Sequence, residues 1–314
     1  MIISESDAKP DTLKFDFAIV AVGYERRCRW VTKEFAIEAK SGWGLEFGFL
    51  ADGSYRENRT YFEGLGFNII VGLRDDAVDI LTKAFLSNAS ATASIFVDIS
   101  SMSREMIANV ALAIQRIRSQ RMVSITIAYA PSRFSGAYAP APIRLASPIK
   151  PSLAGWSSQP EMPLGAIFGL GCEPDLALGA LQLLEPNKAW IFKPKGIDPK
   201  FDAAMKAANL HIEDIFDVSN FGYEISKPAS ARGRLEALLN AIDKSFRLIV
   251  VPFGPKIFAW LAISTVVFSG RSNVGVWAFS SKEHASVIDR DAEGHVIWHS
   301  LNLEGLSEQQ TVHS

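Results

Sequence analysis

The sequence predicts an α/β fold made of two Rossmann-like parallel-sheet domains related by internal duplication. The 314-residue chain is long enough for about two domains of ~150 residues each. Apolar runs of strand length alternate with helix-like stretches in both halves, the order typical of parallel sheets covered by helices on both faces. A proline-rich segment over residues 141–163 falls at the middle of the chain and cannot continue a helix or a central strand.

The first half contains five short apolar or β-branched runs, which predict buried strands. These strands are residues 17–22, 45–50, 68–71, 94–97 and 123–128. The stretches between them are helix-compatible, and the clearest repeat apolar residues every three or four positions. These helices are residues 28–39, 55–65, 76–86 and 105–117.

The second half repeats the same order of elements. Its predicted strands are residues 165–170, 189–192, 212–216, 248–251 and 274–278. Its predicted helices are residues 175–184, 199–208, 232–242 and 257–268. The first strand of each half ends in Gly-x-Glu, at Gly23 and at Gly171. We therefore predict a first domain over 1–140, a linker over 141–163 and a second domain over 164–314 that ends in a hairpin.

Composition and charge exclude several classes of protein. A hydrophobic content of 48% indicates a packed core rather than a disordered chain. A net charge of −2 argues against a coat for duplex DNA or a polybasic membrane binder, because both need a surface of one sign. Cys28 and Cys172 lie far apart, which predicts neither a disulfide scaffold nor a cysteine zinc site. No signal core or membrane-length apolar run is present, so we expect a cytoplasmic protein without membrane contact.

The loop after the first strand is the first candidate ligand site, since ligands of open parallel sheets bind beyond the carboxyl ends of the strands. It contains Gly23, Tyr24, Glu25, Arg26 and Arg27. Guanidinium groups hold phosphate oxygens in a bidentate fork, and Tyr24 is placed to stack on a base. Glu25 would pair with one of the arginines, accept from a ribose hydroxyl or act as a general acid/base. The alternative is a solvated first helical turn with a packed tyrosine.

The loop after the fourth strand is the second candidate. Small hydroxyl residues at a strand-to-helix turn expose donors to an anion. The predicted donors and the counter-charge are Ser100, Ser101, Ser103 and Arg104. Asp98 precedes them, either as a brace for the loop or as a general acid/base. The alternative for Ser103 is a helix N-cap.

The matching loops of the second half give weaker candidates, namely Gly171, Glu173, Gly254 and Lys256. The turns 52–56 and 193–196 are further candidate contacts. No GxGxxG or GxxxxGK[ST] pattern is present, so no dinucleotide or ATP cofactor of those types is predicted. His295 and His299 share a strand face, and we interpret both as surface histidines rather than metal ligands.

Residues 98–106, Asp-Ile-Ser-Ser-Met-Ser-Arg-Glu-Met, resemble the loop of CARF domains, the Rossmann-like sensors of cyclic oligonucleotides in prokaryotic antiviral defence. The residues that match the family pattern are Ser100, Ser103, Arg104 and Met106. Ser101 and Met102 stand where the family has paired glycines. Two such units in one chain resemble the SAVED domain, a fused CARF-like pair.

The resemblance implies binding of a cyclic oligonucleotide or related small nucleotide in a cleft between the two halves. It also implies an effector protein as partner. Some CARF proteins cleave their own ligand, so an enzyme acting on a nucleotide through Glu25 or Asp98 stays an alternative. A scaffold protein whose degenerate cleft binds nothing is the second alternative. Whether the chain forms a homodimer is left open by the sequence.

Overall fold

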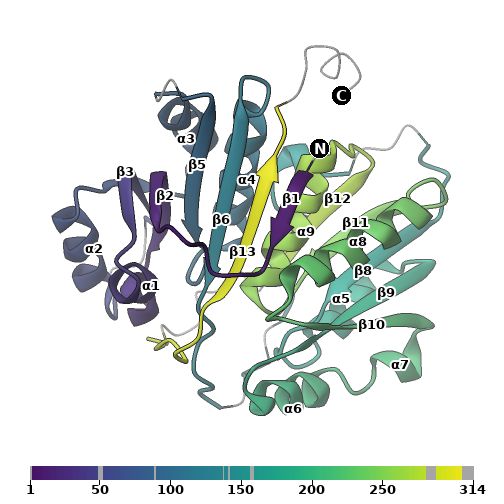
Figure 1. Cartoon of the computed structure of the whole chain (residues 1–314). Helices are drawn as coiled ribbons and strands as arrows, with labels where there is room; N and C mark the ends of the chain where they lie inside the picture. Colours follow the sequence, from purple (N-terminus) through teal and green to yellow (C-terminus); the bar gives the residue numbers. More distant parts are fainter. Residues whose placement is uncertain are drawn as a thin grey trace. The chain divides into compact units, whose positions relative to one another are not determined.

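The computed structural model describes residues 2–48, 52–87, 90–136, 138–140, 142–155, 159–280 and 288–305. The chain divides into two compact units, each with its own sheet (Figure 1). Unit 1 is Met1–Arg133 together with Ser286–Ser314, and unit 2 is Phe134–Ala285.

The seven-stranded sheet of unit 1 has the order β1-β13-β6-β5-β2-β3-β4. Its strands are β1 (Ile2–Ser6), β2 (Lys14–Val22), β3 (Glu38–Glu46), β4 (Asn68–Val71), β5 (Thr92–Asp98), β6 (Met122–Tyr129) and β13 (Ile297–Leu303). Neighbours among β2 to β6 pair in parallel, while β13 and β1 add to the β6 edge in antiparallel fashion. The helical elements of unit 1 are η1 (Arg26–Arg29), α1 (Trp30–Glu34), α2 (Tyr55–Gly64), α3 (Ala77–Leu86) and α4 (Arg104–Ile117).

The six-stranded sheet of unit 2 has the order β10-β9-β8-β11-β12-β7. Its strands are β7 (Leu145–Pro148), β8 (Leu164–Gly169), β9 (Lys188–Lys195), β10 (Val218–Glu224), β11 (Arg247–Pro252) and β12 (Val274–Ser280). Only β7 pairs in antiparallel fashion, with β12. The helical elements are η2 (Pro151–Leu153), α5 (Leu176–Leu184), α6 (Pro199–Ala208), α7 (Ile212–Ile215), α8 (Pro228–Ile242) and α9 (Lys256–Ser269).

The two sheets share one strand order, and this confirms the predicted fold class. In each unit the first five parallel strands lie in the order third, second, first, fourth, fifth, which is the Rossmann-like arrangement. The order reverses between β2 and β5 in unit 1 and between β8 and β11 in unit 2. These reversals are the topological switch points, beside which ligands of open α/β sheets bind.

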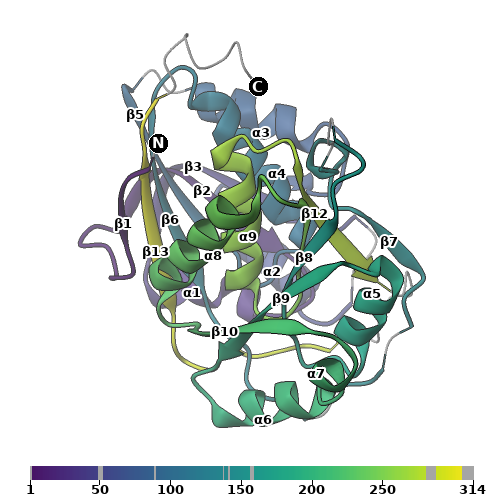
Figure 2. The same ribbon diagram turned by 90° about the vertical axis from the view of Figure 1, so that its right-hand side faces the viewer.

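Apolar strands and helices form the cores because each sheet is covered on both faces. Eight of the nine residues of β2 are buried, as expected for a central parallel strand. In unit 2, α5 and α6 pack on one face of the sheet, and α8 and α9 lie on the other (Figure 2). Residues 257–267 of α9 are all buried, which explains a helix that is apolar on every side. Among the helices that the structure describes, none is long and apolar enough to cross a membrane.

Three predicted elements are wrong in position. The helix predicted over 28–39 is cut short because Ala36 adopts φ 48° and β3 begins at Glu38, so the second strand lies earlier than 45–50. Gly42 and Gly44 interrupt the apolar pattern of this strand, so its beginning was not predicted. Their missing side chains make room for Phe67 and Ile69.

The third misplaced element is the strand predicted over 212–216, which is the one-turn helix α7. Ile212 and Ile215 are three residues apart, a helical spacing that an apolar run of this length does not distinguish from a strand. The third strand of unit 2 follows at Val218–Glu224.

The described elements also divide between the units differently from the predicted boundaries at 140 and 163. β13 belongs to the sheet of unit 1, because it pairs with β6 and β1 rather than forming a hairpin within the second half. Segment 141–163 contains β7 and η2, so part of the predicted linker is a sheet edge of unit 2. His299 of β13 is fully buried, with Nε2 2.5 Å from Oε1 of Glu5, so its interpretation as a surface histidine is wrong.

Candidate functional site

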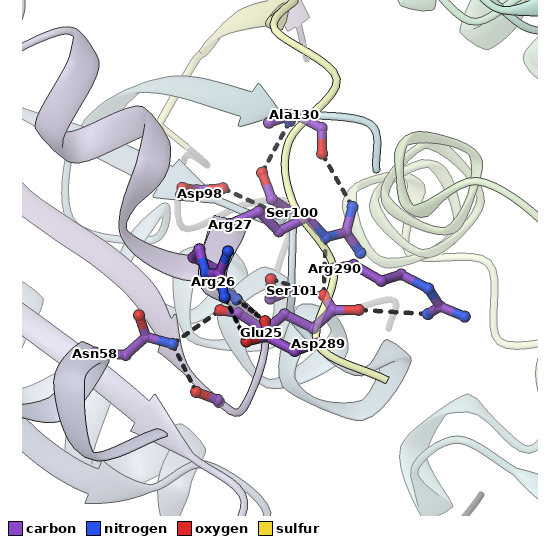
Figure 3. A network of polar contacts seen from close by, with 11 residues as sticks. Glu25, Arg26, Arg27, Asn58, Asp98, Ser100, Ser101, Ala130, Asp289 and Arg290 are labelled. Atoms are coloured by element: carbon purple, nitrogen blue, oxygen red, sulfur yellow. Dashed lines mark hydrogen bonds and ion pairs between the residues drawn. The ribbon is translucent and has the colours of Figure 1, made fainter. Parts of the chain in front are cut away.

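The loops after β2 and β5 lie side by side because the two strands pair in parallel. Val20 of β2 is in register with Asp98, the last residue of β5. The predicted first and second candidate loops are therefore brought together at the switch point of unit 1 (Figure 3). Each loop turns into a helical element, η1 after β2 and α4 after β5.

A buried ion pair between Glu25 and Arg27 forms the centre of this site. Both side chains are 94% buried, and Arg27 Nε donates to Glu25 Oε2 at 2.8 Å. Ser101 Oγ donates to the same oxygen at 3.0 Å, and Arg290 Nη1 reaches Oε1 at 3.3 Å. Burial raises the pKa of the Glu25 carboxyl, but Arg27 and the other donors outweigh it and hold the pKa below its usual value. Glu25 therefore stays ionised as an acceptor with three donors.

The rest of the first loop is held by hydrogen bonds to its carbonyl oxygens and by contacts of its side chains. Asn58 Nδ2 donates to the carbonyl oxygens of Gly23 and Glu25, each at 2.8 Å. Arg27 Nη1 donates to the carbonyl of Ala130 at 3.0 Å, so this guanidinium is committed within the protein. Tyr24 is half-buried and packs near Phe47, with ring centroids 6.3 Å apart. These contacts fit the packing alternative for Tyr24 and a positioning role for Arg27.

The hydroxyl groups of Ser100, Ser101 and Ser103 are each engaged by other residues of unit 1. The backbone N–H of Ser100 donates to Asp98 Oδ1 at 2.9 Å, and Ser100 Oγ accepts from Ala130 N–H at 2.8 Å. Ser103 is the N-cap of α4, because its Oγ accepts from Met106 N–H at 3.1 Å. Arg104 is the first residue of that helix. The capping alternative for Ser103 is thus realised in the structure.

Asp98 is a buried carboxylate of this site, and one of its oxygens accepts no hydrogen bond from the described residues. It is 2% exposed, and its Oδ2 has no hydrogen-bond partner among the residues that the structure describes. Burial raises the pKa of Asp98 to about 6, against the lowering effects of Ser100 and Arg27. A pKa near 6 suits a general acid/base, whereas a 2% exposed side chain has little contact with any ligand in solution.

We expect Asp98 to make the protein less stable as the pH rises. Its pKa is 3.8 when unperturbed and about 6 in the folded chain, so between these values the folded state holds more protons than the unfolded state. The contribution of Asp98 to the free energy of unfolding should fall across this window by about 3 kcal/mol. Urea denaturation at pH 4 and pH 7.5 measures this, with Asp98→Asn as the non-titrating control. Parallel pH dependence of the two proteins would contradict the assignment.

A third segment of this site, residues 288–293, was not predicted from the sequence, because it contains no ligand-binding motif. Asp289, Arg290 and Asp291 contact the first loop, from positions more than 260 residues away in the sequence. Backbone hydrogen bonds also hold this segment. Arg27 N–H donates to the Arg290 carbonyl, and Arg133 N–H donates to the Asp291 carbonyl. No local signal reveals such a long-range contact.

In unit 2, the predicted glycines bring the loops after β8 and β11 into contact. Gly254 has φ 75°, and a Cβ there would lie 2.0 Å from the carbonyl oxygen of Leu170. A Cβ on Gly171 would lie 3.0 Å from Gly254 N and 2.2 Å from Glu173 Oε2. The close approach expected at Gly254 is therefore an approach of backbone to backbone. Lys256 begins α9.

A pocket of about 590 Å³ opens at the carboxyl ends of β8 and β9, beside β10, α6 and α7. Its apolar lining residues are Leu170, Ile191, Pro194, Met205, Leu210 and Ile212. Its polar lining residues are Lys193, Lys195, Asp202, Lys206, Asn209, Glu213 and Asn220. The pocket thus combines an apolar wall with three ammonium groups, two carboxylates and two amides.

The charged groups of this pocket differ in whether they pair with other residues of the protein. Lys193 pairs with Glu213, and Asp202 Oδ1 accepts from Gly196 N–H at 2.7 Å. Lys195 and Lys206 are exposed, and neither forms an ion pair with any residue that the structure describes. These two ammonium groups supply the cationic side of the pocket. The turn 193–196 pointed to this region in the sequence, but Lys206 and Asn220 carried no signal there.

Over the described ranges, no group of three or more His, Cys, Asp or Glu side chains is placed to hold a metal ion. No protein-family model and no curated protein matches this sequence. Among solved structures, a universal stress protein from Archaeoglobus fulgidus DSM 4304 aligns with a TM-score of 0.25 and 13% sequence identity. The alignment covers 87% of this chain and 100% of that chain. The fold assignment therefore rests on the strand order described above.

Proposed function

We propose that the protein binds a small nucleotide-type anion, a cyclic oligonucleotide or a related nucleotide, in the pocket of unit 2. The observation that carries the proposal is the pocket of about 590 Å³ at the strand ends, with Lys195 and Lys206 at its rim. Its place at the carboxyl ends of β8 and β9 is where ligands of open parallel sheets bind.

The chemistry of the lining matches the parts of a nucleotide. The apolar wall, with Ile191 and Met205, offers a surface for the face of a base. The amides of Asn209 and Asn220 are suited to hydrogen-bond base edges or ribose hydroxyls. Ammonium groups bind phosphate as point charges, and over the described ranges neither Lys195 nor Lys206 forms an ion pair. One ligand would thus satisfy all three kinds of lining group.

The size of the pocket favours one nucleotide unit. Sites for small molecules commonly enclose about 300–1,000 Å³, and this pocket lies within that range. A larger cyclic oligonucleotide would place one of its nucleotides here. The same pocket offers no surface for a duplex, in keeping with the net charge of −2.

The sensing role rests on the resemblance of residues 98–106 to the CARF loop. On that resemblance, we propose that ligand binding is reported to an effector protein in a prokaryotic defence system. The free cysteines Cys28 and Cys172 fit the reducing cytoplasm, in which such a sensor would act.

A thermal-shift screen tests the proposal. The panel contains AMP, ADP and cyclic di-, tri- and tetranucleotides. A ligand that binds only the folded state raises the Tm, and the rise grows with the ratio of ligand concentration to Kd. At least one member should raise the Tm, and chromatography should recover it unchanged. A panel without any shift would contradict nucleotide binding. A converted ligand would instead favour the alternative of an enzyme acting on the nucleotide.

A further inference from the structure

A carboxylate of the chain itself is held by anion-binding donors at the first loop of unit 1. Asp289 Oδ1 accepts from the backbone N–H of Arg26 at 2.6 Å, and Oδ2 accepts from Ser54 Oγ at 2.7 Å. The guanidinium of Arg26 completes the set, with Nη2 3.6 Å from Oδ2. Figure 3 shows Asp289 beside Glu25 and Arg26, on the segment that also carries Arg290.

The Ser54 hydroxyl is directed to Asp289 rather than to its own helix. Ser54 is the N-cap residue of the ten-residue helix α2, yet its side chain makes no capping hydrogen bond. Its hydroxyl points to Asp289 instead, although a serine at this position usually caps its own helix. The side chain is 95% buried, and its backbone N–H is fixed on the Tyr24 carbonyl at 2.9 Å. The donor is thus preorganised, and the positive end of the helix dipole also favours an anion here.

We propose that these donors form an anion site in unit 1 that takes a phosphate group, and that Asp289 is its internal occupant. A backbone N–H, a hydroxyl and a guanidinium are the donors that hold phosphate oxygens as well as carboxylates. A phosphate-bearing ligand therefore binds in competition with Asp289. This site is separate from the pocket of unit 2 and shares no residue with it.

Competition between phosphate and Asp289 determines how firmly segment 288–293 is held on the first loop. Besides Asp289, this segment is held by the ion pairs of Arg290 with Glu25 and of the exposed Asp291 with Arg26. A tethered carboxylate acts at an effective concentration of the order of millimolar, which an external anion has to exceed. Binding of phosphate then removes both side-chain hydrogen bonds of Asp289 and loosens the segment on the first loop.

The test compares variants of the full chain with inorganic phosphate as the probe. Lys195→Ala and Lys206→Ala are included in every protein, so that the pocket of unit 2 contributes no phosphate binding. Asp289→Ala should bind phosphate at least tenfold more tightly than the protein with Asp289 intact, by isothermal titration. Asp291→Ala is the matched control, since it removes the same charge but leaves Asp289 on its donors.

The outcomes distinguish a phosphate site formed by these donors from a general effect of removing one negative charge. Adding Ser54→Ala to Asp289→Ala should abolish the gain in phosphate affinity. Equal affinity of the Asp289→Ala and Asp291→Ala proteins would overturn the proposal, as would retention of the gain without Ser54. If Asp289→Ala does not fold, Asp289→Asn replaces it, because its amide oxygen still accepts from Arg26 N–H without the charge. An Asn variant that binds phosphate no better than the parent would equally overturn the proposal.

Discussion

Replacing Glu25 by glutamine is expected to lower the free energy of unfolding by about 3–5 kcal/mol, because it leaves a buried guanidinium without its counter-charge. Arg27 is 94% buried and has Glu25 as its carboxylate partner at 2.8 Å. Arg290 loses the same partner. Urea denaturation followed by circular dichroism measures the change.

Two further variants distinguish burial from simple loss of charge. Glu57→Gln removes a carboxylate that is 69% exposed and pairs with Arg29, so its expected cost is about 0–1 kcal/mol. Combining Glu25→Gln with Arg27→Met should recover part of the stability, since no unpaired charge is then buried. A loss below 1 kcal/mol for Glu25→Gln, or strict additivity in the double variant, would contradict this account of the ion pair.

Replacing Gly254 by alanine is expected to cost about 3 kcal/mol or more. The backbone of Gly254 adopts φ 75°, which disfavours an L side chain by about 1–2 kcal/mol. The new Cβ would also overlap the Leu170 carbonyl oxygen, and that oxygen belongs to the loop after the neighbouring strand β8. The two loops would have to separate, which disturbs the end of the sheet beside the pocket.

Gly270→Ala is the matched control for this variant. Gly270 has a similar φ of 66°, but a Cβ there would meet no atom within 4 Å. Its cost should therefore be only the conformational part, about 1–2 kcal/mol. Urea denaturation of the two variants measures the difference. Equal losses would show that the contact between the loops after β8 and β11 does not matter.

Hydrophobic pattern was sufficient to predict most strands and helices of the fold. The strand at 68–71 and the helix at 199–208 agree with β4 and α6 at both ends. The errors occur where local sequence is ambiguous. The glycines within β3 interrupt the apolar pattern by which a strand is predicted. The segment Ile212–Ile215 is compatible with either one helical turn or a short strand. Pairing of β13 with β6 depends on contacts across the whole chain, which pattern alone does not contain.

The candidate site was predictable in position but not in its internal bonding. Strand ends located the loops at Gly23 and Asp98, and the register of β2 with β5 places them together. Pairing of Glu25 with one of the loop arginines was one of the predicted alternatives, but that Arg27 is the partner depends on side-chain geometry, which sequence pattern does not contain. The pocket of unit 2 was indicated only by the turn 193–196, since its other polar residues come from α6, α7 and β10.

Titration of AMP into the protein tests nucleotide binding by the unit 2 pocket most directly, since AMP supplies one base, one ribose and one phosphate. Isothermal titration is carried out with the wild-type chain, with Lys195→Ala/Lys206→Ala and with Lys200→Ala, whose exposed side chain lies on α6 and does not line the pocket. We expect binding that weakens at least tenfold in the double variant and is unchanged in Lys200→Ala. No binding up to about 5 mM AMP, a concentration at which sites of typical metabolite affinity are saturated, would contradict the account, as would equal affinity in all three proteins.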